Sequence, residues 1–187
     1  MSISVLDMSV SLDGYIADPD DFLGGDDGER LHKWDDADGE PSGPVKQFQD
    51  EWSAAGAVLA GRRTAELMDH WGGSHAGLPI IVPSHRPPGP AARWGYPLVT
   101  YVTDGIESAM AQAKAAAGDR YVLVHGAHTA QRALEAGVLD ELQIHQIPVL
   151  FGGGRRLFEE LPSRFELEIV RVIDTAEATH IRYRVRR

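Results

Sequence analysis

The stretch AVLAGRRTAE, residues 57–66, is the part of the sequence that decides the fold class. It opens with small and aliphatic residues typical of a buried strand, then runs into Gly61, two arginines and Thr64 before helix-forming residues resume. A glycine at a strand end lets a backbone approach a ligand closely, and the next helix N-terminus offers N–H groups to an anion. Alternatively, the strand ends at the surface and the arginines are solvated. This stretch supports both interpretations equally, so the rest of the chain has to decide between them.

Length and composition limit the class of protein. The 187 residues fit one domain, residues 1–187, with 43 % hydrophobic and 25 % charged residues, as in ordinary globular proteins. The net charge of −10 argues against nucleic acid or an anionic membrane as a partner. The absence of cysteine excludes disulfides and thiolate chemistry. No apolar run approaches the roughly 20 residues that span a bilayer, and the N-terminus lacks signal-peptide features, so we expect a cytoplasmic protein.

Strand-like and helix-like segments alternate along the chain. Strands are expected at residues 3–10, 57–61, 78–84, 98–102, 120–126, 141–151, 165–173 and 179–187, and helices at about 45–55, 64–71, 104–117 and 129–137. The nearly continuous apolar character of 120–126 is typical of a parallel strand covered on both faces. In 179–187, apolar residues alternate with arginines, which is typical of a half-buried strand. The pattern predicts an α/β fold with a mostly parallel central sheet and antiparallel C-terminal strands.

Three local features carry further predictions. Asp104 and Glu107 form a capping box at the start of their helix. Pro148 indicates a bulge or a sheet edge in its strand. The polar segment 11–44 is interpreted as a long loop, and loops of this length are usually functional or mobile.

Several common motifs are absent from the sequence. GGGRR at 152–156 lacks the ending of a P-loop, and no Gly-x-Gly-x-x-Gly follows a strand. The eight histidines show no helical His-x-x-x-His spacing, so no metal site is expected. Glycines do follow strands at Gly61 and Gly126. Because ligands of open α/β sheets bind beyond the carboxyl ends of the strands, two strand–glycine–helix junctions suit the two phosphates of a dinucleotide.

Four segments together resemble a known family. MSVSLDGYIA, AGRRTAELMDHW, LVHGAHTAQRAL and GVLDELQIHQIPVLFGGGRRLF occur in the order seen in the dihydrofolate-reductase-like superfamily. More narrowly, nearly the whole chain resembles the C-terminal reductase domain of the riboflavin-biosynthesis deaminase–reductase. The resemblance implies a three-layer dihydrofolate-reductase-like fold and an NADPH-dependent reductase.

The resemblance also implies where the cofactor binds. Its phosphates are expected at the two glycine turns, on Gly61, Arg62, Arg63 and Thr64 and on Gly126, Ala127, His128 and Thr129. The adenosine 2′-phosphate is expected at the polar end of the third strand, on Ser84, His85 and Arg86. The nicotinamide is expected against the first strand and the loop after it, on Met8, Ser9 and Ile16.

The sequence departs from the family pattern at several positions. The family's paired glycines after the fifth strand are His125-Gly126 here, and the tyrosine after Gly-Arg-x-Thr is Ala65. The carboxylate that dihydrofolate reductases place against the pterin ring would fall near Val45, which disfavours a folate reductase. The Asp-Asp/Asn-Pro segment is replaced by residues 65–71, and the zinc-binding deaminase half is missing, which also weakens the case for the riboflavin reductase itself.

Aromatic residues mark the expected substrate pocket, which we place among the 11–44 segment, the first helix and the segment 68–71. The candidate ring-stacking residues are Trp34, Phe48, Trp52 and Trp71. Ordinary core packing is an equal alternative for Phe48 and Trp52. Asp13 either contacts the substrate or shapes the loop turn through backbone hydrogen bonds. No residue identifies itself as the proton donor, so the catalytic residues are unknown.

Two classes of function remain open. The first is a reductase that delivers hydride from NADPH to a C=N or C=O bond of a pterin-like or ribosylaminopyrimidine-like molecule, with a divergent dihydrofolate reductase as a variant. The second is a non-catalytic NADP-binding or sensing protein on the same fold. A homodimer is expected, with strand 179–187 as a sheet edge. Residues 18–43 are expected to close over the nicotinamide through Phe22, Leu23 and Trp34.

Overall fold

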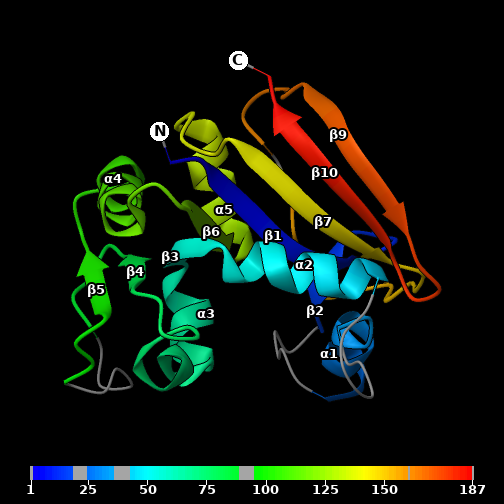
Figure 1. Ribbon diagram of the computed structural model, residues 1–187, viewed down its shortest axis with the longest axis horizontal. Helices are drawn as coiled ribbons and strands as arrows, with labels where there is room; N and C mark the ends of the chain where they lie inside the picture. Colours follow the sequence, from blue (N-terminus) through cyan, green and yellow to red (C-terminus); the bar gives the residue numbers. More distant parts are fainter. Residues whose placement is uncertain (1, 19–24, 36–42, 89–94, 160, 187) are drawn as a thin grey trace. The chain divides into compact units, whose positions relative to one another are not determined.

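The computed structural model of the chain describes residues 2–18, 25–35, 43–88, 95–159 and 161–186 (Figure 1). Its contacts divide the chain into two compact units. The first unit is Met1–Leu6 with Ala54–Asp140, and the second is Asp7–Ser53 with Glu141–Arg187. Each unit is described by itself, and the assignment of residues 1–187 to a single domain stays a prediction.

The first unit contains the parallel part of the sheet. Its strands are β3 (Ala55–Ala60), β4 (Ile80–Pro83), β5 (Val99–Val102), β6 (Tyr121–His125) and the start of β1 (Ser4–Ser11). They are hydrogen-bonded in the order β5-β4-β3-β6-β1, and these pairings are parallel. Every residue of β3 is buried, as expected for a parallel strand covered on both faces.

Small residues let the helices of the first unit approach its strands. The helices are α3 (Arg62–Leu67), the short helix η1 (Asp69–Gly73), α4 (Ile106–Ala117) and α5 (Ala127–Glu135). Ala109, Ala113 and Ala117 form one buried face of α4 at a spacing of four residues. A Cβ added to Gly56 of β3 would lie 2.5 Å from the carbonyl oxygen of Ala117, so α4 packs directly on the β3 backbone.

The second unit contains the antiparallel strands. They are β7 (Glu141–Ile147), β9 (Leu167–Asp174) and β10 (Thr179–Val185), and β10 pairs antiparallel with both others. A separate two-stranded sheet pairs β2 (Tyr15–Ala17) with β8 (Arg155–Arg156), and the helices are α1 (Gly25–His32) and α2 (Gly43–Ser53). The whole strand order, β5-β4-β3-β6-β1-β7-β10-β9, confirms the predicted α/β class with antiparallel C-terminal strands.

The prediction that the C-terminal strand is a sheet edge is wrong. β10 has β7 on one side and β9 on the other, so β9 is the outer strand. The sequence does not reveal this order, because either strand of the hairpin has the pattern to pair with β7.

The strand predicted at 141–151 is shorter than expected. It ends at Ile147, because Pro148 has no N–H for the ladder.

The capping box predicted for α4 is wrong as well. Gly105 is the N-cap, with φ 110° and no capping side chain. The Asp104 carboxylate instead accepts a hydrogen bond of 2.8 Å from the Ser108 hydroxyl. Glycine takes the cap position because a positive φ suits it better than any other residue.

The polar segment 11–44 is not one long loop, because it contains β2, α1 and the first residues of α2. α1 forms despite its glycines and aspartates because Leu31 is buried against Ile147 and Ala178, and tertiary contacts override weak helix propensity. Residues 19–24 and 36–42 lie outside the described residues, and Phe22 and Leu23 of the predicted lid are among them. The lid stays a prediction.

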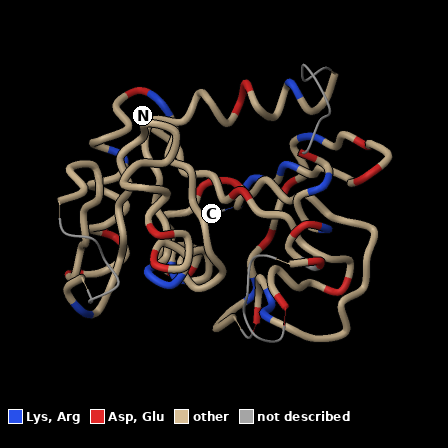
Figure 2. The backbone as a smooth tube through the Cα atoms, turned by 90° about the horizontal axis from the view of Figure 1, so that it is seen from below, with Lys and Arg blue, Asp and Glu red and all other residues tan. Residues whose placement is uncertain are grey.

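The positions of basic and acidic residues are interspersed along the described backbone (Figure 2). This distribution accompanies the net charge of −10. Among the helices of the described residues, none combines the length and apolar character needed to cross a membrane.

Candidate active site

Two glycines lie next to each other at the carboxyl ends of neighbouring parallel strands in the first unit. Gly61 follows β3 and Gly126 follows β6, and the register pairs Ala60 with His125. The Gly61 N–H donates a hydrogen bond of 3.2 Å to the His125 carbonyl. The prediction that two strand–glycine–helix junctions share one sheet end is confirmed.

The two glycine turns interlock. A Cβ on Gly61 would lie 2.6 Å from Oγ1 of Thr129, and a Cβ on Gly126 would lie 2.9 Å from Oγ1 of Thr64. Each glycine thus faces the threonine of the other turn. Gly126 also has φ 96°, a conformation that favours glycine, whereas Gly61 has φ −58° and is required by the contact alone.

The interlock corresponds to a short repeat that the sequence analysis missed. Gly-x-x-Thr-Ala occurs at residues 61–65 and again at 126–130. In each copy the alanine is fully buried under the turn. Gly126 caps α5 without a side-chain bond, so no capping side chain satisfies the first-turn N–H groups among the described residues. Ala127 and Thr129 are buried in that turn and His128 is exposed.

Arg62 connects the end of β3 with the segment after β4. Its Nη1 donates to Oγ of Ser84 at 3.1 Å and to the carbonyls of Arg86 and Pro87 at 3.2 and 2.9 Å. Its Nε lies 2.9 Å from the Glu66 carboxylate. The segments that follow β3 and β4 therefore converge, with the Arg62 guanidinium held in one orientation. Arg63, His85 and Arg86 have exposed side chains.

The helix predicted at 64–71 breaks into a left-handed turn. α3 ends at Leu67, and Asp69, His70 and Trp71 have φ of 43°, 53° and 50°. Such conformations are uncommon for non-glycine residues and cluster at functional sites. The His70 ring is buried, and its Nε2 lies 2.8 Å from the Tyr101 hydroxyl.

The left-handed turn places Trp71 beside two histidines of the first unit. The Trp71 ring packs edge-on against His75 at 4.5 Å and lies 6.2 Å from His125, the residue before Gly126. Burial, and then the neighbouring His125, lowers the pKa of His75 to about 4. This aromatic cluster of Trp71, His75 and His125 therefore borders the Gly126 turn with His75 neutral at pH 7.

In the second unit, two of the four predicted ring residues, Trp34 and Phe48, pack against each other, and Trp34 also contacts β1. Trp34 Nε1 donates to Oγ of Ser9 at 2.9 Å, and the Trp34 ring stacks on His145 with centroids 4.1 Å apart. Phe48 packs edge-on against Trp34 and is only 6 % exposed, so it supports the site as a core residue. Of the other candidates in this unit, Met8 and Trp52 are half-buried and Ile16 is buried.

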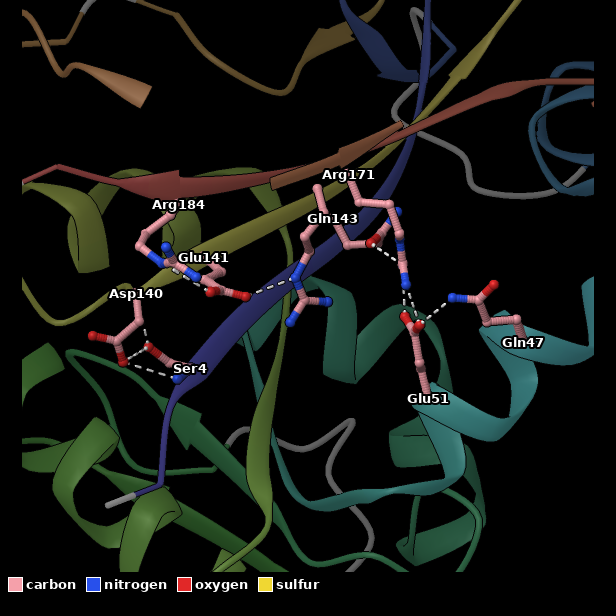
Figure 3. Close-up of polar contacts among 9 residues, drawn as sticks. Ser4, Gln47, Glu51, Asp140, Glu141, Gln143, Arg171 and Arg184 are labelled. Carbon is pink, nitrogen blue, oxygen red and sulfur yellow. Dashed lines mark hydrogen bonds and ion pairs between the residues drawn. The ribbon is translucent and has the colours of Figure 1, made fainter. Parts of the chain in front are cut away.

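An ion pair fastens α2, which carries Phe48, to β9 (Figure 3). The Arg171 guanidinium donates to both carboxylate oxygens of Glu51, and it also reaches Oε1 of Gln143 at 3.3 Å. It lies 5.7 Å from the centre of the Phe48 ring. Bidentate arginine–carboxylate pairs fix geometry as well as charge, so Phe48 is held in place.

Asp13 shapes the turn after β1. Its carboxylate accepts hydrogen bonds from the Ser11 hydroxyl at 2.6 Å and from the N–H groups of Phe151 and Gly152 at 3.1 and 2.7 Å. The bond from Ser11, followed by those from Gly152 and Phe151, lowers the pKa of Asp13 to about 2. These contacts match the turn-shaping role that was one of its two predicted alternatives.

The structure also joins two histidines that the sequence left scattered. β7 and β10 pair His145 with His180 in register, and their Nδ1 atoms lie 2.6 Å apart. The signal available in the sequence was a histidine at an inward position of each strand. In the described part of the chain, no three His, Asp or Glu side chains could together hold a metal ion.

A family model described as the RibD C-terminal domain matches residues 4–181. No curated protein matches the chain significantly. A solved structure of a protein assigned to riboflavin biosynthesis, from Shewanella sp. PV-4, is 25 % identical, with a TM-score of 0.78 over 99 % of each chain.

More distant structures share the fold alone. RibD from Acinetobacter baumannii is 18 % identical with a TM-score of 0.63, and the match covers 100 % of this chain and 58 % of that one. Dihydrofolate reductase from Enterococcus faecalis, solved with NADP(H) and RAB-propyl, is 15 % identical with a TM-score of 0.60 over 99 % and 97 % of the chains. The predicted dihydrofolate-reductase-like fold is confirmed.

Proposed function

The chain belongs to the RibD C-terminal domain family and is an oxidoreductase, and from this premise we propose that it is an NADPH-dependent reductase. Its substrate is a ribosylaminopyrimidine-like or pterin-like small molecule, reduced at a C=N or C=O bond. The cofactor, when bound, supplies the hydride. The chain's own residues bind the cofactor, orient the substrate and exclude water.

The interlocked glycine turns are the observation that carries this proposal. Neither Gly61 nor Gly126 can gain a Cβ without striking the threonine of the other turn, so the backbone segments at the ends of β3 and β6 are packed closely together. A phosphate can approach such backbone closely, and the N–H groups that begin α5 suit its charge. The proposed phosphate ligands are Gly61, Arg62, Arg63, Thr64, Gly126, Ala127, His128 and Thr129.

Arg62 supports the choice of NADPH over NADH. Its guanidinium is already oriented by Ser84 and by backbone carbonyls, so little side-chain entropy is lost when it binds an anion. Arginine binds phosphate through parallel charge-assisted hydrogen bonds. The 2′-phosphate is proposed to lie at Arg62, with Ser84, His85 and Arg86 beside it.

The nicotinamide is proposed to lie against Met8, Ser9 and Ile16. The substrate ring is proposed to stack on Trp34, supported from behind by Phe48, with Trp52, Trp71 and Asp13 as further contacts. Trp34 suits this role because its Nε1 is fixed by Ser9 and one ring face is fixed by His145. Rigid aromatic side chains bind rings without a large loss of conformational freedom.

Cofactor titration tests the proposal. Losing one charge-assisted hydrogen bond, worth roughly 1.5–3 kcal/mol, should weaken NADPH binding to Arg62→Ala by about tenfold or more and leave NADH binding nearly unchanged. Binding is measured by fluorescence at low salt, so that screening does not hide the effect. Arg132→Ala is the matched control, because this arginine of α5 also pairs with a carboxylate, Glu135, at 2.7 Å.

The outcomes separate the alternatives. Equal affinity of the wild-type protein for NADH and NADPH would overturn the cofactor assignment. A preference for NADPH that Arg62→Ala leaves intact would move the 2′-phosphate to Arg63 or Arg86. Cofactor oxidation is then followed with ribosylaminopyrimidines, pterins and dihydrofolate. Binding of NADPH without its oxidation by any of these compounds would favour the alternative of a non-catalytic NADP-binding or sensing protein.

A further inference from the structure

A line of four polar side chains crosses the interior of the second unit. Asp7 Oδ1 lies 3.4 Å from Nε2 of His145, whose Nδ1 lies 2.6 Å from Nδ1 of His180. His180 Nε2 in turn lies 3.3 Å from the Thr175 hydroxyl. The four residues come from β1, β7, β10 and the chain just after β9, so the tertiary fold assembles them.

The two histidines are sealed from water. Each is 1 % exposed, whereas the Asp7 side chain is 26 % exposed. Trp34 stacks on His145, and the Phe48 ring lies 4.3 Å from that of His180. The line therefore reaches solvent at the carboxylate of Asp7.

The contacts dictate where the protons of the pair lie. A contact of 2.6 Å between two ring nitrogens needs one N–H donor and one lone pair. Nε2 of His145 faces a carboxylate and so carries a proton, which makes its Nδ1 the acceptor. His180 then donates from Nδ1, and its Nε2 lies 3.3 Å from the Thr175 hydroxyl, which also contacts the Ala178 carbonyl at 2.9 Å. The line of contacts ends at Asp7, whose Oδ1 lies at the ion-pair distance of 3.4 Å from His145 Nε2.

Burial and neighbouring groups set the charge of the His180 ring. Burial, followed by His145, lowers the pKa of His180 to about 4. Asp7 and Asp174 act in the opposite direction, and Arg171 acts in the same direction. Arg171 is itself paired with Glu51 of α2. At pH 7 the His180 ring is therefore neutral.

Asp7 lies at the right place to serve the reaction. It is two residues before Ser9, so both side chains extend from the same face of β1. Trp34 bridges that face by contacting Ser9 and His145. The aromatic ring on which the substrate is proposed to stack therefore packs on the histidine that contacts Asp7.

We propose that Asp7 is the proton donor of the reductase, and that His145 and His180 are positioning residues that orient its carboxyl group. This rests on the proposed function. Hydride adds to the carbon of the substrate C=N or C=O bond, and the π electron pair moves to the nitrogen or oxygen. That atom takes the proton from the Asp7 carboxyl group. The carboxylate regains a proton from solvent after the product leaves.

In other histidine–carboxylate pairs, a hydrogen bond to one ring nitrogen fixes the tautomer and so decides what the other ring nitrogen can bind. The same principle underlies the proposed orienting role of His145 and His180. His145 Nε2 faces Oδ1 at 3.4 Å, so the transferable proton is proposed to be carried on Oδ2. His180 acts through His145, because without the donor at its Nδ1 the tautomer of His145 is no longer fixed.

The test compares Asp7→Asn with Asp50→Asn, which removes an exposed carboxylate of α2 in the same unit. Asp7→Asn should lower kcat about 100-fold or more, the usual size of general acid catalysis, and abolish the alkaline fall in kcat. The KM for NADPH and fluorescence-measured NADPH binding should stay within about twofold of wild type, because Asp7 does not hold the cofactor's phosphates. Asp50→Asn should behave as wild type.

A second measurement needs no turnover. Nitrogen-15 NMR of the ligand-free wild-type histidines should show His145 as the Nε2–H tautomer and His180 as the Nδ1–H tautomer at neutral pH. His180→Phe keeps a ring against Phe48 but removes the donor, so His145 should become a mixture of tautomers and kcat should fall about tenfold, at the low end of such effects.

The possible results separate the role of Asp7, the orienting role of the histidine pair and the proposed function. A wild-type rate and pH profile in Asp7→Asn would overturn the role of Asp7 and leave the proposed function standing. An Nδ1–H tautomer of His145 in the wild-type protein would overturn the orienting role of the pair, even if Asp7→Asn does not fold. No turnover by the wild-type protein would overturn the proposed function and Asp7 as its acid together.

Discussion

Gly61 and Thr129 pack so closely that a Cβ on the glycine would lie 2.6 Å from the threonine hydroxyl oxygen. Thr129 is 3 % exposed and has little room to move. Because Gly61 has φ −58°, an alanine there would be acceptable to the backbone and would be opposed only by this contact. The pair therefore isolates the effect of close packing from that of backbone conformation.

Gly61→Ala should destabilise the protein by about 1–3 kcal/mol, the usual cost of overpacking a core. Chemical denaturation measures the change in the free energy of unfolding. Adding Thr129→Ala removes the obstructing oxygen, so the double variant should recover part of the loss, with Thr129→Ala alone as the control. Strictly additive effects of the two substitutions would contradict the close contact.

The acid stability of the turn after β1 should depend on Asp13. Its folded-state pKa of about 2 lies below the ordinary value for an aspartate. The stability from its ionised form is therefore present above about pH 4 and is lost as the pH falls toward 2. The melting temperature of Asp13→Asn should lie below that of the wild type at pH 6, and the two should converge near pH 2. A difference in melting temperature between the two proteins that stays constant as the pH falls would argue against the hydrogen bonds to the Asp13 carboxylate.

The buried histidine pair should make the protein sensitive to mild acid. His180 has a folded-state pKa of about 4, below the ordinary value of about 6.5. Between these values the unfolded chain binds more protons, so stability is full above about pH 6.5 and falls as the pH drops toward 4. Thermal melts of His180→Phe should show a shallower loss over this range than wild type. The pKa of His75 is also lowered by burial, so some loss of stability with falling pH should remain in His180→Phe.

A homodimer is expected, but through β9 rather than β10. β9 is the outer strand, and Leu167, Ile169, Val170 and Val172 are exposed along it. Unprotected edges with apolar side chains favour pairing with another strand. Ile169→Lys should shift the mass measured by light scattering toward 20.4 kDa, that of one chain. Leu12→Lys, at a side chain 59 % exposed outside β9, is the control. A wild-type mass of one chain at micromolar concentration would remove this prediction.

The sequence by itself determined the features that depend on neighbours along the chain. The apolar run 57–60 and the glycine after it identified most of a buried strand and its turn, because burial on both faces and a close backbone approach each leave a local signature. The same local reasoning failed where a distant contact decides the outcome. α1 forms because Leu31 packs on Ile147, more than a hundred residues away in the sequence.

Only the tertiary structure decided which side chains meet. Gly61 contacts Thr129 because β3 and β6 are neighbours in the sheet, and His145 contacts His180 because β10, rather than β9, pairs with β7. Strand order is set by the total burial and hydrogen bonding of the whole sheet, which no window of sequence contains. Asp7 shows the consequence. On the sequence it is one of several polar residues in its strand, and in the fold it ends a line of polar contacts that begins at Thr175.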